Sequence, residues 1–314
     1  MATRRSYIIR PSTAGLGRTV CALVFVLAIM AAAALRADAQ SGTNEAPGKT
    51  CLWAVESGAH RVFLLGSIHF LRPDAYPLPA AMEAAYAASR VIVFETDIAQ
   101  MMDLSVQARM LELGMLPPGQ SLFDVLGPDT RQRLERKLRD TGLPAEALAG
   151  FKPWVIALTL SSLEFIRLGF SPDFGVDMHF FQKAQADQKR IEALETVEYQ
   201  LQLLAGMDDA LQEKFLAQTL QELELAAGVA PDLVRYWADG RVDALRQLLF
   251  KTIDQYPDTR DRMLIRRNQA WVEKIEGFIR RGEAALVIMG AMHLIGPGSV
   301  VDLLQQKGLR IQQR

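Results

Sequence analysis

Two apolar segments near opposite ends of the chain finish in the same way, with a glycine followed three residues later by a histidine. The first is VFLLGSIH, residues 62–69, and the second is ALVIMGAMH, residues 285–293. Each apolar run has the length and the aliphatic content of a buried strand. Because buried strands need neighbours in a sheet, the two ends of the chain are expected to meet in one sheet.

The sequence around these runs alternates between strand and helix patterns. Residues 51–66 predict a hairpin, because two apolar runs flank the turn-like stretch ESGAH. A helix at 78–89 and a β-branched strand at 90–97 follow, so the order strand, helix, strand over 61–96 predicts a parallel βαβ unit. A further short strand is expected at 189–196, in KRIEALET.

The middle of the chain, about 98–282, has mainly helical patterns, and no low-complexity linker separates it from the strands. The end of the chain returns to a strand, a helix and a strand. The predicted fold class is therefore α/β, with a mixed β-sheet core built from the N- and C-terminal segments and a large helical middle or cap region. We expect a single domain over residues 51–314 with this helical insertion.

The first 39 residues have the pattern of an export signal. Four arginines precede the uncharged run TVCALVFVLAIMAAAAL, and ADA before Gln40 fits a cleavage site. A permanent membrane anchor is the alternative, but a run of 17 residues is slightly short to span a bilayer. We expect cleavage, by a general or twin-arginine export route, and no stable membrane span afterwards. We also expect a flexible lead-in over residues 40–50 and a periplasmic or secreted location.

Charge and cysteine content limit the possible partners. The whole chain has a net charge of −1, and its first 39 residues contain five arginines and one aspartate, so the remainder is mildly acidic. No basic run with interleaved aromatic residues occurs, which argues against a nucleic-acid partner. Cys51 is the one cysteine outside the predicted signal, so no disulfide within the mature chain is expected.

The two glycine–histidine steps, Gly66 to His69 and Gly290 to His293, are the first candidates for a functional site. Ligands of open α/β sheets bind beyond the carboxyl ends of strands, and glycine there lets the backbone approach a ligand closely. On neighbouring strands, the two steps would place both imidazoles over one cleft. A satisfied loop histidine explains either step alone, but the chain has only four histidines, so the repetition favours a site.

Two predicted strands end in a glutamate followed by a threonine, VIVFET at Glu95 and RIEALET at Glu195. A strand end is where a charge can face a cleft instead of the core. The alternative is a solvated carboxylate or one that helps to cap the next helix. We expect Glu95 to belong to the site, because the first histidine unit is predicted to neighbour its strand. For Glu195 the two interpretations stay open.

Polar residues on predicted helices are further candidates. Asn268 falls on the apolar stripe of the helix RDRMLIRRNQAWVEKIEGFI, and Arg267 borders the same face. A buried amide needs partners, because an unpaired one costs roughly 1–3 kcal/mol. A hydrogen bond to a loop explains Asn268 nearly as well as a role in a site. The same ambiguity applies to Asp177 and His179, and a hydrogen-bonded core histidine is the default interpretation of His179.

Two imidazoles and a carboxylate form a ligand set for a divalent metal with open coordination positions. Such a metal lowers the pKa of bound water to about 7. A further carboxylate, Glu195, would then act as general base or acid, and an arginine or asparagine would stabilise an oxyanion. The chain contains no H-E-x-x-H, G-x-S-x-G, Walker or C-x-x-C motif.

The chain resembles the TraB/GumN family, which includes the Tiki proteins. The matching stretches are LLGSIH, PLPAAMEAAYAASRVIVFETD, GVDMHF, LETVEYQLQLL, RNQAW and GAMHLIGPGSVVDLL. The resemblance implies a mixed α/β fold and, in Tiki-like members, metal-dependent proteolysis centred on His69, His293 and Glu95. Arg267 and Asn268 match the Arg-Asn step of the family. Arg266 departs from the acidic residue often found before that step.

Two hypotheses of different classes follow from these observations. The first is an exported metal-dependent hydrolase with peptidase-like activity on a peptide or small-molecule substrate, using His69, His293 and Glu95 at a divalent metal. Glu195, Arg267, Asn268 and His179 would complete that site. The second is a non-catalytic periplasmic protein that binds a metal, haem or a peptide and regulates another process. The sequence does not indicate the substrate, the metal or the oligomeric state.

Overall fold

The computed structural model describes residues 48–57 and 60–314, which form one mixed six-stranded sheet with helices around it. The order of the strands across the sheet is β4-β3-β5-β2-β1-β6. The strands are β1 (Leu52–Ser57), β2 (His60–Ser67), β3 (Val91–Phe94), β4 (Arg190–Ala193), β5 (Ala285–Gly290) and β6 (Ile311–Gln313). The predicted α/β fold class is confirmed. The export signal predicted for residues 1–39 lies outside the described residues.

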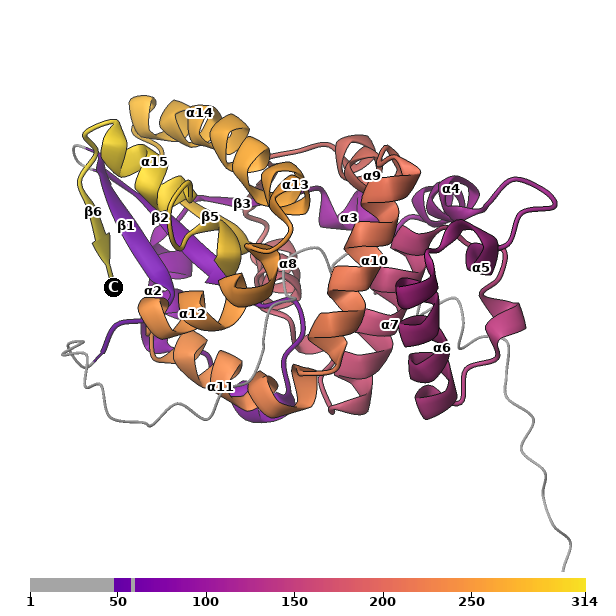
Figure 1. The fold of residues 1–314 in the computed structure, drawn as a ribbon. Helices are drawn as coiled ribbons and strands as arrows, with labels where there is room; N and C mark the ends of the chain where they lie inside the picture. Colours follow the sequence, from indigo (N-terminus) through magenta and orange to yellow (C-terminus); the bar gives the residue numbers. More distant parts are fainter. Residues whose placement is uncertain (1–47, 58–59) are drawn as a thin grey trace, which may run out of the picture.

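The two ends of the chain share this sheet, as the strand patterns predicted. β1 and β2 form the expected antiparallel hairpin, and β6 pairs antiparallel with the other edge of β1. The backbone N–H of Thr50 also donates to the carbonyl oxygen of Arg314 over 2.5 Å. Figure 1 shows the C-terminal strand β6 beside β1 at the left of the molecule.

The strands that end in the two glycine–histidine steps are neighbours. β2 pairs in parallel with β5, in a register that sets Ser67 beside Gly290. The expected direct pairing of β2 with β3 is wrong, because β5 lies between them and pairs in parallel with both. All six residues of β5 are buried, which suits the central position of this strand. Local sequence patterns carry no information on which distant strand enters a sheet.

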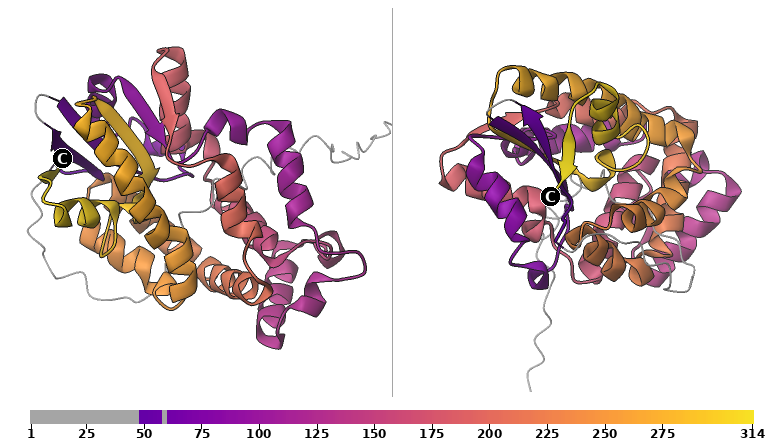
Figure 2. Two further views of the ribbon diagram at one scale, coloured as in Figure 1. Left: turned by 90° about the horizontal axis from the view of Figure 1, so that it is seen from above. Right: turned by 90° about the vertical axis from the view of Figure 1, so that its left-hand side faces the viewer.

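Helices cover both faces of the sheet (Figures 1 and 2). α14 (Arg266–Arg280) and α15 (Val300–Gln306) pack on one face, while α2 (Ala80–Ala88) and α8 (Val176–Ala186) lie on the other. On that second face the rings of Tyr86 and Phe180 stack with centroids 5.4 Å apart. Cover on both faces explains why every residue of β3 is buried as well.

The helical middle of the chain forms a lobe beside the carboxyl ends of the parallel strands (Figure 1). Its helices are α3 (Ile98–Met101), α4 (Leu104–Gly114), α5 (Leu122–Val125), α6 (Pro128–Thr141), α7 (Pro153–Arg167), α9 (Val197–Ala205) and α10 (Asp209–Leu223). An apolar cluster of its own, which includes Leu134, Ile156 and Leu216, holds α5, α6, α7 and α10 together. This lobe gives the site one of its walls.

The remaining helices return the chain from the lobe to the sheet. They are α11 (Ala226–Ala238), α12 (Val242–Ile253), α13 (Pro257–Arg260) and the π-helix η5 (Asp261–Ile265), which runs directly into α14. Short π-helical segments inside α-helices occur frequently at functional sites. Within residues 48–57 and 60–314, no helix combines the length and the apolar character that crossing a membrane requires.

Candidate active site

The four strands β2, β5, β3 and β4 run parallel, so their carboxyl ends meet at one edge of the sheet. Glu95 follows β3 directly, and Glu195 comes two residues after β4. The two residues are adjacent, because the N–H of Glu195 donates to the carbonyl oxygen of Glu95 over 2.8 Å. The neighbours of β3 are β4 and β5, so Glu95 adjoins the second histidine unit. The strand order expected from the sequence would instead place Glu95 beside the first unit.

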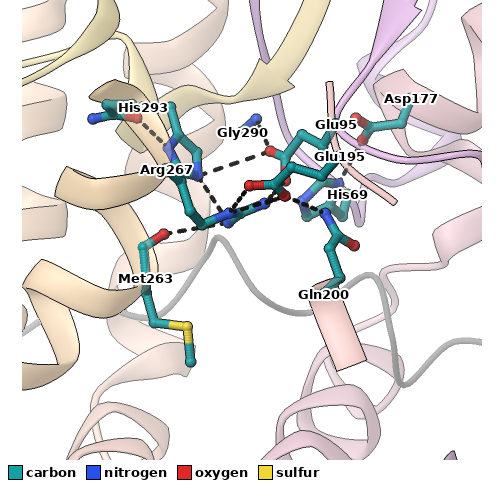
Figure 3. A network of polar contacts seen from close by, with 10 residues as sticks. His69, Glu95, Asp177, Glu195, Gln200, Met263, Arg267, Gly290 and His293 are labelled. Carbon is teal, nitrogen blue, oxygen red and sulfur yellow. Dashed lines mark hydrogen bonds and ion pairs between the residues drawn. The ribbon is translucent and has the colours of Figure 1, made fainter. Parts of the chain in front are cut away.

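The guanidinium of Arg267, on the first turn of α14, lies at the centre of this edge and is completely buried (Figure 3). Its Nη2 donates to Glu95 Oε2 over 2.7 Å and to Glu195 Oε2 over 2.9 Å. Its Nε donates to Glu195 Oε1 over 3.0 Å. Its Nη1 donates to the carbonyl oxygen of Met263 and to Nε2 of His293. These contacts engage all the nitrogen atoms of the guanidinium.

His293, from the second glycine–histidine step, is fully buried beside Arg267. Its Nδ1 lies 2.6 Å from Oδ1 of Asn268, whose own Nδ2 donates to the carbonyl oxygen of Gly298 over 2.8 Å. An amide oxygen only accepts, so the Nδ1 of His293 carries the hydrogen and Nε2 accepts from Arg267 over 3.3 Å. Burial lowers the pKa of His293 to about 3, and Arg267 adds to this effect against the opposing charge of Glu95. The ring is therefore neutral at pH 7.

His69, from the first step, forms a buried pair with Asp177 at the start of α8. The Nδ1 of His69 lies 2.6 Å from Oδ2 of Asp177, so the hydrogen on Nδ1 is donated to the carboxylate. Burial by itself would lower the pKa of His69, but the charge of Asp177 and this hydrogen bond raise the pKa above its usual value. The two histidines of the repeat thus have opposite electrostatic environments within one network.

Glu95 is ionised in this network. Burial would raise the pKa of its carboxyl, but the charge of Arg267, followed by the histidines and the Gly290 N–H, lowers the pKa to about 2. The N–H of Gly290 donates to Oε1 of Glu95 over 2.7 Å. That oxygen is also 3.9 Å from Nε2 of His293. Glu95 therefore links the end of β3 to the end of β5 and to α14.

Gly66 and Gly290 serve different structural purposes. A Cβ atom at Gly66 would lie 2.6 Å from Sγ of Cys51, so close packing within the hairpin excludes a side chain there. The carbonyl oxygen of Gly66 accepts a hydrogen bond of 2.6 Å from the buried indole of Trp237. Gly290 serves the network directly through its N–H on Glu95. The predicted role of these glycines in binding a cofactor stays a prediction.

The structure brings together most of the residues that the sequence singled out. Figure 3 shows the side chains of the two histidines, the two glutamates and Arg267 converging from separate elements. His179 is not among them, since its Nε2 lies 2.8 Å from Oε1 of Glu83 on α2. Gln200 on α9 was not anticipated and donates to Glu195 Oε2 over 3.2 Å. The one signal in the sequence that could have identified Gln200 is its place as a polar residue on the inward face of a predicted helix.

The atoms around Arg267 that would bind the predicted metal already make hydrogen bonds. Nε2 of His293 accepts from Arg267, and each oxygen of Glu95 accepts a hydrogen bond. Across residues 48–57 and 60–314, no group of three or more His, Cys, Asp or Glu residues is placed to hold a metal ion. The set of His69, His293 and Glu95 therefore does not fit a metal in the arrangement described. Metal binding by this set requires Arg267 to withdraw from His293.

A buried centre of two histidines, two glutamates and an arginine, at the carboxyl edge of parallel strands, defines this chain as an α/β protein with a candidate enzymatic site. The family that these features indicate is confirmed by comparison with known proteins. The chain belongs to the TraB/PrgY/gumN family, whose match covers residues 51–313.

The curated relatives are distant in sequence. The chain is 23% identical to the uncharacterized protein YbaP of Escherichia coli (strain K12), over 79% of this chain and 89% of that protein. It is 24% identical to the metalloprotease TIKI2 of Danio rerio, over 80% of this chain and 58% of the relative. It is 23% identical to the human metalloprotease TIKI1, over 94% of this chain and 68% of the relative. No solved structure matches the chain.

Proposed function

We propose that the chain is a hydrolase with peptidase-like activity, and that the network around Arg267 is its active site. The observation that carries this proposal is the convergence of His293, Glu95 and Glu195 on one buried arginine, close enough to His69 for the charges of Arg267 and Glu95 to influence that histidine. Charged groups are seldom buried together, and perturbed pKa values cluster at functional sites. The names of the TIKI relatives support peptide bonds as the substrate class.

His69 is the proposed general base. Asp177 holds the hydrogen on Nδ1, which leaves the lone pair of the ring on Nε2. The charge of Asp177 and its hydrogen bond raise the pKa of His69 above the usual value, which makes the ring a stronger base. The imidazole would take a proton from water as the water oxygen adds to the carbonyl carbon. It would return that proton to the amine nitrogen as the peptide bond breaks.

Arg267 is proposed as a positioning residue. Its contacts with Glu95, Glu195, Met263 and His293 use the donors of its guanidinium, so it orders the neighbouring groups instead of reaching toward a substrate. Ser67, at the end of β2, has a completely buried hydroxyl that lacks a hydrogen-bond partner within the described part of the chain. The register of β2 and β5 places this hydroxyl beside Gly290, whose N–H binds Glu95.

The test is peptide cleavage by the purified protein, followed by mass spectrometry of an unfolded peptide library. We expect His69→Ala to lower kcat by at least 10²-fold, the usual contribution of a general base. Glu222→Gln is the matched control, since Glu222 is a buried glutamate on α10 outside this network. Failure of the wild-type protein to cleave any peptide would favour the binding protein over the hydrolase.

Metal binding stays a prediction that competes with this mechanism, because a metal on Nε2 of His69 would occupy the lone pair that acts as the base. Export stays a separate prediction. Elemental analysis of the wild-type protein and of His69→Ala/His293→Ala tests the metal. A divalent ion present in the wild type and lost in the double variant would show that Arg267 withdraws from His293 to admit it. Equal metal contents would remove both histidines as ligands. The export signal predicted for residues 1–39 would place the activity in the periplasm or outside the cell.

A further inference from the structure

A cavity opens directly beside the network, between the short helix α3 and the helices α4 and α9. Its volume is about 370 Å³, and its lining residues are Gln100, Ser105, Val106, Arg109, Thr196, Val197, Glu198 and Leu201. Thr196 and Val197 follow Glu195 in the chain, and Gln100 lies five residues after Glu95. The cavity therefore begins where the two strands that carry the buried carboxylates end.

The wall of this cavity is mainly apolar. Val197 and Leu201 on α9 are buried, and Val106 on α4 lines the same cavity. The charged residues Arg109 and Glu198 are exposed and lie close enough to influence each other. An apolar interior beside a few polar groups is the usual composition of a site that binds a small ligand.

Three large apolar side chains on or beside the helices that form the cavity are exposed. Met102 is 49% exposed and Leu104 is 79% exposed at the junction of α3 and α4, and Tyr199 is 42% exposed on α9. A contiguous exposed apolar patch marks an interaction site. Figure 1 shows α3, α4 and α9 together at the end of β3, on the side of the helical lobe.

We propose that this cavity binds an apolar side chain of the peptide substrate and thereby sets the specificity of the site. The claim that the bound peptide is a substrate rests on the proposed function. Binding of an apolar side chain depends only on the cavity. Its volume lies at the small end of the range for ligand sites, so it suits a single large side chain such as leucine or phenylalanine. Thr196 lines the cavity and directly follows Glu195 in the chain, so a side chain bound there would lie near the network.

Two substitutions fill the cavity from two of the helices that line it. Val106→Phe adds a ring from α4, and Gln100→Trp adds one from the exposed end of α3, where the risk to folding is small. Leu111→Phe is the matched control, because Leu111 lies on α4 with 39% of its surface exposed and does not line the cavity. Circular dichroism and thermal unfolding verify that each variant is folded.

The experiment uses blocked tripeptides that differ only in a central leucine, phenylalanine, alanine or glycine, with binding measured by calorimetry and cleavage measured separately. We expect the wild-type protein to prefer leucine and phenylalanine by at least about tenfold, the range that apolar pockets provide. Both filling variants should abolish this preference and Leu111→Phe should retain it.

The two arms separate failure of the subsite from failure of the proposed function. If nothing is cleaved but the binding preference exists and disappears in the filling variants, the subsite stands and the hydrolase does not. Equal binding of leucine and glycine peptides by the wild-type protein would overturn the subsite, whether or not cleavage occurs. A preference that survives in both folded filling variants would overturn it as well.

Discussion

The guanidinium of Arg267 lies 2.7 Å from the carboxylate of Glu95, although 172 residues separate them in the chain. Arg267 is completely buried and also binds Glu195, so one cation is shared by two carboxylates that protrude from adjacent strands. Removal of one partner from such a buried group is strongly destabilising, because the remaining charge stays in a medium that solvates it poorly.

Arg267→Met is therefore expected to lower the free energy of unfolding by about 3–5 kcal/mol, measured by urea denaturation. The loss arises because Glu95 and Glu195 remain buried without their cation. In the triple variant Arg267→Met/Glu95→Gln/Glu195→Gln the glutamines are neutral, so most of this loss should be recovered. Simple addition of the separate effects in the triple variant would contradict the shared-cation arrangement.

Asp177→Asn tests the environment of His69. The charge of Asp177 raises the pKa of His69, so this substitution should lower that pKa, as followed by NMR titration of the ring. A raised histidine pKa stabilises the folded protein below the unfolded pKa of about 6.5, and this stability is lost as pH rises through the folded pKa. The stability deficit of the variant should thus be largest below about pH 6.5. An unchanged pKa of His69 would show that the charge of Asp177 does not influence this histidine.

Gly66→Ala tests the packing reason for the first motif glycine. The added Cβ atom would meet Sγ of Cys51 at 2.6 Å, and overpacking of this kind typically costs about 1–3 kcal/mol. Cys51→Ala removes the sulfur, so the double variant should be more stable than the sum of the two single effects predicts. Thermal unfolding of the four proteins measures this coupling. Additive effects would show that Cys51 does not restrict residue 66.

Glu222→Gln should stabilise the protein at neutral pH. Glu222 is buried on α10, where burial raises the pKa of its carboxyl well above its usual value, and its Oε2 has no hydrogen-bond partner within the described residues. The unfolded chain ionises above about pH 4.5 while the folded state keeps the proton, so stability falls as pH rises above that value. Glutamine keeps the contact with Gln218 and removes this loss.

The expected gain from Glu222→Gln is about 1–3 kcal/mol at pH 7 and close to zero at pH 4, where both states of the wild-type carboxyl are protonated. Denaturant unfolding at the two pH values measures it. The same gain at both values would show that the effect comes from packing and not from ionisation.

The sequence by itself determined the elements and the chemical character of the site. Apolar runs that end at Gly66 and Gly290 marked two buried strands, and the glutamates that follow two others marked the edge where charges gather. These features are local, since periodicity, strand ends and turn residues depend on near neighbours in the chain. The place of Asn268 on an apolar stripe predicted a buried amide with hydrogen-bond partners, but it left open whether those partners lie in a loop or in the site.

The tertiary structure alone decided how these parts combine. It placed β5 between β2 and β3, set Glu95 beside the second histidine unit, and gave His69 the carboxylate of Asp177 as a partner. It also joined His179 to Glu83 on α2. Each of these contacts links residues far apart in the chain, and their energies depend on burial and on distances of a few ångströms. Such quantities exist only once the chain has folded, because in the extended chain water solvates each of these groups separately.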